Sequence, residues 1–99
     1  MAEDKDFHVE GKIFSLEQTS TPQGIETRLV LERPRHSSGN EAPIISFPSP
    51  TGLRLGDYIS VHGRRIDRAR EFPVGYAETI FHLKDKKKRE VLETYKIGY

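Results

Sequence analysis

The most informative segment of the chain is Leu53-Arg54-Leu55-Gly56-Asp57-Tyr58-Ile59-Ser60-Val61-His62-Gly63. Gly56 and Asp57 predict a turn, because glycine accepts the backbone angles of tight turns and an aspartate side chain can accept hydrogen bonds from turn amides. After the turn, Ile59, Val61 and Gly63 alternate with polar side chains, which is the two-residue period of a half-buried strand. The glycine inside this strand indicates a bend or a close approach of two chain segments.

The same two-residue period recurs in four other segments, at residues 7–16, 25–31, 44–47 and 77–83. Turns or polar loops that contain proline and glycine separate these segments, as expected for short strands. In the first segment the apolar phase slips between Ile13 and Phe14, which predicts a β-bulge that bends the strand. Three aromatic side chains are expected in the core from their place in the alternation, namely Phe7, Phe14 and Phe81.

The chain has 99 residues, a length that suits one domain. Its last part favours a short helix over residues 84–95, because Val91, Leu92 and Tyr95 fall on one helical face and most other positions are charged. The expected organisation is a disordered acidic tip at residues 1–6, an all-β domain at residues 7–83, and a helix with a tail at residues 84–99.

Two glycine-containing patterns stand out along the chain. The first segment carries Val9-x-Gly11-x-Ile13, and the fourth carries Leu53-x-Leu55-Gly56-Asp57-x-Ile59-x-Val61-x-Gly63. The second pattern resembles a run that is common before and along strand four of OB-fold domains, such as replication protein A-like single-strand binders and anticodon-binding domains of aminoacyl-tRNA synthetases. The resemblance covers residues 7–83 and implies a five-stranded Greek-key barrel of the OB type. Many OB domains place a helix between strands three and four, whereas residues 48–53 leave room here only for a turn.

An arginine-rich stretch joins the fourth and fifth segments and is the strongest functional signal. It contains Arg64, Arg65, Arg68 and Arg70 within seven residues, followed by Phe72 and Tyr76. In the OB-fold this loop borders the ligand-binding face. Single-stranded nucleic acid needs cations for its phosphates and flat rings for its bases, and this stretch has both. The alternative is a solvated loop whose arginines pair with nearby acidic side chains, namely Asp67, Glu71 and Glu78.

Four more side chains are candidates for the same interface, namely Arg28, Arg33, Tyr58 and His62. Arg28 is expected to face outward on the second strand, and Arg33 follows that strand, so both would lie on or beside the expected binding face. Tyr58 follows the Gly-Asp turn and is expected to face outward, where its ring could stack on a base. His62 is expected on the outer face of strand four, as a neighbour of His8. The basic run at residues 84–89 is interpreted as a solvated helix face or, alternatively, as a nonspecific phosphate contact.

The sequence contains no motif of catalysis or metal binding. There is no cysteine, and the four histidines share no metal-ligand spacing. A nucleophile elbow, a phosphate-binding loop and a dinucleotide-binding fingerprint are all missing. We therefore expect no enzymatic activity, no cofactor and no bound metal.

The expected function is a nucleic-acid-binding module for single-stranded DNA or RNA, which the sequence does not distinguish. The formal net charge is only +1, so modest affinity and strong salt dependence are expected. The alternative is a protein-interaction OB module that acts as a subunit of a larger complex. Because the chain lacks a long apolar run and begins with polar, acidic residues, we expect no membrane partner and a cytoplasmic location.

Overall fold

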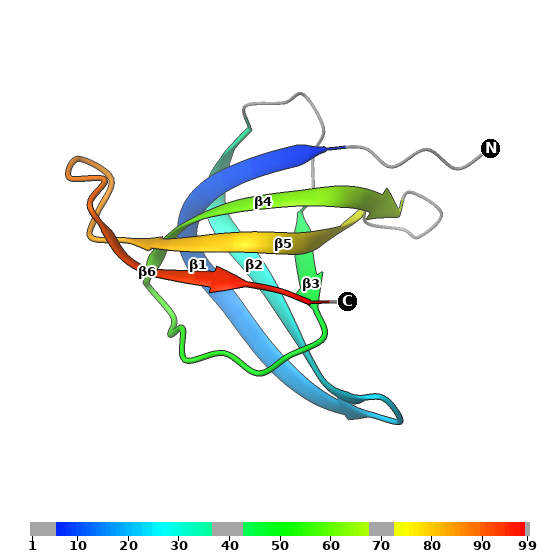
Figure 1. Cartoon of the computed structure of the whole chain (residues 1–99). Coiled ribbons are helices and arrows are strands. Elements are labelled where there is room, and N and C mark those ends of the chain that lie inside the picture. Colours follow the sequence, from blue (N-terminus) through cyan, green and yellow to red (C-terminus); the bar gives the residue numbers. More distant parts are fainter. Residues whose placement is uncertain (1–5, 37–42, 68–72, 99) are drawn as a thin grey trace.

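Six β-strands make up the computed structural model of the chain, which describes residues 6–36, 43–67 and 73–98 (Figure 1). The strands are β1 (Phe7–Thr21), β2 (Gly24–His36), β3 (Ile44–Phe47), β4 (Tyr58–Asp67), β5 (Val74–Leu83) and β6 (Val91–Lys96). The all-β expectation is confirmed, but there is one strand more than the five expected from the sequence. None of the described residues forms a helix, so none of them forms a helix that could cross a membrane.

The strand pairings form a cycle. β1 pairs with both β2 and β4, β2 pairs with β3, and β4 pairs with β5, all antiparallel. β3 then pairs with β5 in parallel, which returns the series to its start. β6 lies against β5 as an antiparallel neighbour. Because β4 occupies one edge of β5, the strands β3 and β6 must share the other edge, one after the other along β5.

The core lies on the inner face of this cycle and is apolar. Its side chains are Phe7, Val9, Ile13, Leu29, Leu31, Ile45, Phe47, Leu53, Ile59, Val61, Ala77 and Ile80. They come from β1 to β5 and from the segment before β4, and in β1 to β4 the strand members stand at alternating positions, as the two-residue period predicts. The expectation that Phe7 belongs to the core is confirmed, since only 2% of its surface is exposed.

The predicted bulge in the first strand is confirmed. The register between β1 and β2 shifts between Ile13 and Ser15, which leaves Phe14 as the extra residue. A bulged residue is turned away from the regular alternation, and the Phe14 side chain is 68% exposed. The expectation that Phe14 belongs to the core is therefore wrong. A second shift, between Glu10 and Lys12, places the extra residue on β2, where residues 33 and 34 both lie against Gly11.

The Gly-Asp turn holds the start of β4 against this bulge. Gly56 has a positive φ of 89°, and Asp57 Oδ2 accepts a hydrogen bond from the Arg54 amide at 2.8 Å. The turn bonds to β1 in both directions, because the Ile13 amide donates to the Asp57 carbonyl and the Gly56 amide donates to the Ile13 carbonyl, each at 2.9 Å. The turn predicted from sequence is confirmed, and its backbone completes the hydrogen bonding of the bulged strand.

The pairing of β4 with β5 is also irregular, because each of the two strands has one extra residue. Arg64 on β4 and Glu78 on β5 have no Cα partner opposite them. After this shift Ile80 is buried in the core, whereas Phe81 is half-buried on the outer face. The expected core position of Phe81 is therefore wrong. The extra residue Glu78 shifts the alternation by one position, so that Ile80 rather than Phe81 follows Ala77 into the core.

The helix expected over residues 84–95 is not formed, and β6 stands in its place. Val91 and Tyr95 have side chains that favour strands, and β6 pairs with the half of β5 that β3 does not reach. The chain reverses before β6 because the Asp85 carboxylate accepts hydrogen bonds from the Lys87 and Lys88 amides. An aspartate that binds following amides favours a turn over a helix interior. Residues 84–98 therefore add one strand to the sheet, which forms a hairpin with β5.

Candidate functional site

Three of the sequence-predicted site residues fall in one row across the outer face of the sheet. Arg28 on β2 lies opposite Ser46 on β3, Ser46 lies beside Tyr76 on β5, and Tyr76 lies opposite Arg65 on β4. Neighbouring strands are about 4.8 Å apart, so this outer row is about 14 Å long. It places an arginine at each end of a surface whose middle carries a serine and an aromatic ring.

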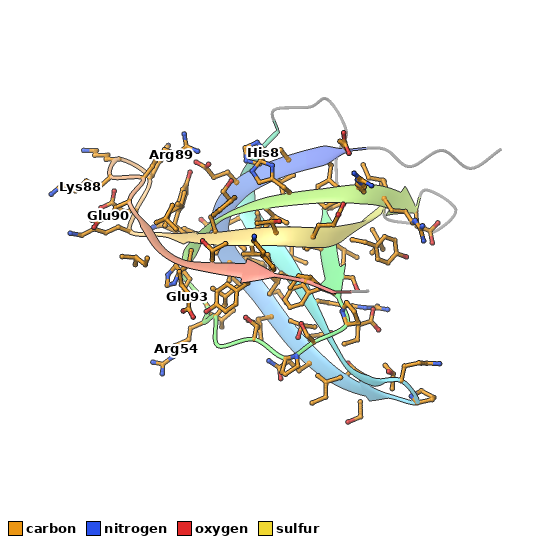
Figure 2. All side chains as sticks on the ribbon, in the orientation of Figure 1. His8, Arg54, Lys88, Arg89, Glu90 and Glu93 are labelled. Carbon is orange, nitrogen blue, oxygen red and sulfur yellow. The ribbon has the colours of Figure 1, made fainter. Side chains whose placement is uncertain are left out.

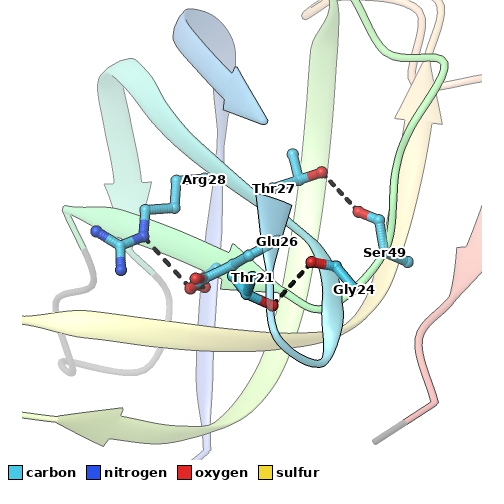
Figure 3. A network of polar contacts seen from close by, with 7 residues as sticks. Thr21, Gly24, Glu26, Thr27, Arg28 and Ser49 are labelled. Carbon is cyan, nitrogen blue, oxygen red and sulfur yellow. Dashed lines mark hydrogen bonds and ion pairs between the residues drawn. The ribbon is translucent and has the colours of Figure 1, made fainter. Parts of the chain in front are cut away.

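A carboxylate anchors one end of the outer row. Glu26 Oε1 accepts a hydrogen bond from Ser46 Oγ at 2.6 Å and another from Arg28 Nε at 3.3 Å. The ion pair is visible in Figure 3, where the Arg28 guanidinium extends past the carboxylate. Because 42% of the Arg28 side chain is exposed, the guanidinium stays accessible to a ligand while its charge is partly neutralised. The contact between Glu26 and Ser46 could not be foreseen from the sequence, because these residues are 20 positions apart.

A shallow open hollow of about 190 Å³ adjoins the row. Its lining combines the β1–β2 hairpin with β3 and β5, through Thr21, Gln23, Ile25, Glu26, Ser46, Phe47, Pro48 and Tyr76. Most of the surface that lines the hollow is apolar, and the Glu26 carboxylate is the charged group among its lining residues. A volume of this size holds one small planar group rather than a drug-sized molecule, which needs several hundred Å³.

The hairpin that walls the hollow is held by its own turn. Gly24 directly follows the turn residues Pro22 and Gln23 and has a positive φ of 126°, as in hairpins whose turn is followed by a glycine of positive φ. Thr21 Oγ1 donates to the Gly24 carbonyl at 2.8 Å, and the Gln23 amide donates to Thr21 Oγ1 at 3.3 Å. Deeper in β2, Thr27 Oγ1 donates to the Ser49 carbonyl at 2.6 Å (Figure 3). These bonds fix the hairpin and the segment after β3 on two sides of the hollow.

The arginine-rich stretch divides in the structure. Arg65 belongs to the outer row and is exposed. Arg64 is exposed too, and its Nε lies 3.5 Å from Glu78 Oε1. For Arg64 the structure therefore agrees with the alternative, in which an arginine of this stretch pairs with a nearby acidic side chain. Arg68, Arg70 and Phe72 lie outside the described residues. Arg33 is part of β2, and its side chain also lies outside the description.

Tyr58 lies on the outer face of β4 but is not available for stacking. Only 7% of its surface is exposed, and its hydroxyl donates to Glu10 Oε2 at 2.7 Å. Arg89 extends from the β5–β6 connection (Figure 2), and its Nη2 donates to Glu10 Oε1 at 2.6 Å. The expectation of an exposed ring at Tyr58 is wrong, because the ring is covered by neighbouring strands and takes part in a buried polar network. Sequence analysis missed Glu10 and Arg89, which are 79 positions apart.

His62 also lies away from the outer row, in a stack with His8. The two imidazole rings are 4.1 Å apart and nearly parallel, which confirms that these histidines are neighbours. Phe81 meets the His62 ring edge-on at 5.7 Å, and Ser60 Oγ is hydrogen-bonded to His8 Nε2 at 2.6 Å. Burial, followed by the positive charge that His62 can carry, lowers the pKa of His8 below its ordinary value of 6.5. His8 is therefore mainly neutral near neutral pH, and its stacking on His62 is a structural contact.

Among the residues that the structure describes, no three histidine, aspartate or glutamate side chains lie close enough together to hold a metal ion. Comparison of the chain with models of protein families, with curated proteins and with solved structures finds no match. An indication of function must therefore come from the geometry of the chain itself, beginning with the outer row and its hollow.

Proposed function

We propose that the chain is an OB-type barrel that binds single-stranded nucleic acid across the outer face of β2, β3, β5 and β4. The cyclic series of strand pairings supports a barrel, and the motif at residues 53–63 supports the OB type. OB-folds bind oligonucleotides on the face of strands two and three, bordered by the loops after strands one and four. The outer row and its hollow occupy that face, and the β1–β2 hairpin borders it.

The observation that carries the proposal is the convergence of Arg28, Tyr76 and Arg65 in one row. Tyr76 is half-buried, so its ring is held in place while part of it remains in contact with solvent. A base stacked on such a ring contributes about 1–3 kcal/mol. The two arginines lie on either side of the ring, where they can contact successive phosphates of a strand that runs along the row.

The charge of the row sets the expected strength of binding. Glu26 pairs with Arg28, so a phosphate must compete with a carboxylate for that guanidinium. We therefore expect weak binding, in the micromolar range at moderate salt, without strong discrimination of sequence. The carboxylate also makes the hollow itself a poor phosphate site, and the hollow suits an uncharged base better.

The test is a titration of a fluorescein-labelled oligothymidylate, and of the matching oligouridylate, followed by fluorescence anisotropy at about 50 and 200 mM salt. The variant Tyr76→Leu should weaken binding about 5- to 150-fold, which corresponds to about 1–3 kcal/mol. Tyr76→Phe is the matched control, because it keeps the ring, and it should stay close to the wild type. The double variant Arg28→Gln with Arg65→Gln should reduce the salt slope by about 1.4, since two phosphate contacts are lost.

Arg54 supplies the control for charge alone, because it is exposed and lies in the turn before β4, outside the outer row. Arg54→Gln should leave the salt slope unchanged. Absence of binding by the folded wild type at low salt would disprove the proposal. If Arg54→Gln weakens oligonucleotide binding as much as replacing an arginine of the row by glutamine does, then only the overall charge matters.

The alternative of a protein-interaction module draws on a different observation, the exposed apolar residues around β6. That surface lies at the far end of β5 from the outer row, since the seven residue steps from Tyr76 to Leu83 span about 23 Å. Both activities can therefore exist on one domain.

A further inference from the structure

Exposed apolar side chains gather at one end of the sheet. Of the described residues, five large apolar side chains are exposed, and four of them are Phe14, Leu55, Val91 and Leu92, with exposed fractions of 68%, 65%, 50% and 55%. Single exposed apolar residues are common, but a group of them at one place indicates an interaction surface. The strand register shows that these four side chains lie at the same end of the sheet.

The register fixes this placement through a second row of paired residues. Lys12 on β1 lies opposite Tyr58 on β4, Tyr58 lies opposite Leu83 on β5, and Leu83 lies opposite Val91 on β6. Leu92 follows Val91 as a bulged residue. Phe14 on β1 and Leu55 before β4 lie two and three residues beyond this row, towards the same end of the sheet.

β6 presents an open edge beside these apolar residues. Within the described residues it pairs only with β5, and five of its six residues are exposed. The Ile97 amide donates to the Glu78 carbonyl at 2.8 Å. Because amides of an antiparallel strand alternate in direction, those of Thr94 and Lys96 point away from β5. Such a row of outward amides and carbonyls can pair with another chain.

A strongly basic loop leads into this edge. Residues 84–90, here called the basic loop, carry five basic and two acidic side chains and are all exposed. The Asp85 carboxylate is occupied by the amides of its own turn. Arg89 binds Glu10, but Lys86, Lys87 and Lys88 follow one another at the tip of the loop (Figure 2 labels Lys88). The field at the start of β6 is therefore positive.

We propose that β6 binds an extended acidic segment of a partner protein, which adds to the sheet as a further strand. The partner's backbone pairs with the outward amides of β6, its apolar side chains cover Val91 and Leu92, and its carboxylates face the basic loop. An anionic lipid surface would use the lysines and the apolar residues but would leave the backbone edge unpaired. A second copy of the chain would bring another basic loop and no matching acidic one.

The test uses the full chain and two fluorescein-labelled octapeptides, one alternating glutamate with valine and the other alternating lysine with valine. The acidic peptide should bind in an anisotropy titration, with an affinity that falls as salt is added, and the basic peptide should not bind. The variant Thr94→Pro removes one outward amide, and proline is tolerated at such an edge position. It should weaken acidic-peptide binding about tenfold, as expected for a lost hydrogen bond of about 1.4 kcal/mol.

Thr94→Val is the matched control, because it keeps the amide and should bind as the wild type does. A variant that does not depend on the strand geometry is the triple change Lys86→Gln, Lys87→Gln and Lys88→Gln. All three side chains are exposed, so the domain should fold normally. This variant should weaken binding of the acidic peptide about tenfold at low salt and flatten its salt dependence.

Several results would overturn the proposal. One is no binding of the acidic peptide at low salt, and another is equal binding of both peptides. A third is unchanged binding by Thr94→Pro, shown to be folded by its circular dichroism spectrum, because the peptide would then use charge alone. A dimer in light scattering that Thr94→Pro abolishes would make a second copy the occupant. Sedimentation with phosphatidylserine vesicles, without peptide binding, would make it a lipid surface. Failure of nucleic-acid binding affects none of these measurements.

Discussion

Gly63→Ala tests the close approach on which the whole strand arrangement depends. Gly63 is buried in β4, opposite Phe7 of β1 and Ala77 of β5. A Cβ at this position would overlap two groups, the ring of Phe7 and the backbone carbonyl oxygen of Tyr76. Phe7 is itself buried in the core, so its ring has little room to rotate away.

The size of the effect follows from these two contacts. Overpacking a buried site by one methyl group costs about 1–3 kcal/mol. Because the carbonyl oxygen belongs to a paired strand and cannot rotate away like a side chain, the upper part of that range applies. Replacing glycine by alanine also restricts the unfolded chain, which stabilises the fold by about 0.4–1 kcal/mol. The expected net loss is therefore about 2 kcal/mol in the free energy of unfolding.

The assay is urea unfolding followed by circular dichroism, with Gly52→Ala as the matched control. At Gly52 the new Cβ would meet only the Tyr95 hydroxyl, at an ordinary 3.9 Å. With an m value of about 1–3 kcal/mol/M, Gly63→Ala should lower the midpoint by about 0.7–2 M, and Gly52→Ala should barely change it. If both variants unfold within about 0.2 M of the wild type, then β1, β4 and β5 do not approach as described.

Three further predictions concern the buried network, the histidine stack and the core. Tyr58→Phe removes a hydrogen-bond donor from the buried Glu10 carboxylate and should cost about 1–3 kcal/mol in urea unfolding, and a loss below about 0.5 kcal/mol would contradict this network. The pKa of His8 in the folded protein lies below its ordinary 6.5, mainly through burial, so its contribution to stability is present above that pH and is lost as pH falls. His8→Gln should therefore show a smaller decrease in melting temperature between about pH 7.5 and pH 5 than the wild type, and equal decreases would refute the assignment. Phe47→Ala should cost about 3–5 kcal/mol because the ring is 1% exposed, whereas Phe14→Ala should cost less than about 0.5 kcal/mol because that ring is 68% exposed. Comparable midpoints for the two variants in urea would contradict the placement of Phe14 in the bulge.

Local patterns in the sequence predicted much of the fold. The turn at Gly56 and the bulge near Phe14 depend only on residues close together in the chain, so both could be foreseen. The alternation also predicted that Arg28 faces outward, which the structure confirms. It failed where a bulge at Glu78 shifted the phase, because the sequence of β5 contains no signal for that irregularity.

The C-terminal segment shows the limit of a local pattern. Val91, Leu92 and Tyr95 fit one face of a helix, but the same residues also suit a strand. The pairing with β5 favours the strand, because β6 satisfies backbone groups along one edge of the second half of β5 that a helix would leave to solvent. A helix at residues 84–95 would have left the backbone groups of that edge without partners from the sheet.

The all-β class, the turn, the first bulge and the types of side chain available for binding follow from the order of the residues alone. Which of those side chains meet depends on how the strands pair. Arg28, Tyr76 and Arg65 form one row because β3 pairs in parallel with β5 and so connects β2 to β4 across the outer face. Tyr58 is buried because neighbouring strands cover it and Glu10 binds it. Strand neighbours are set by long-range hydrogen bonds and shared burial, which the two-residue period does not encode.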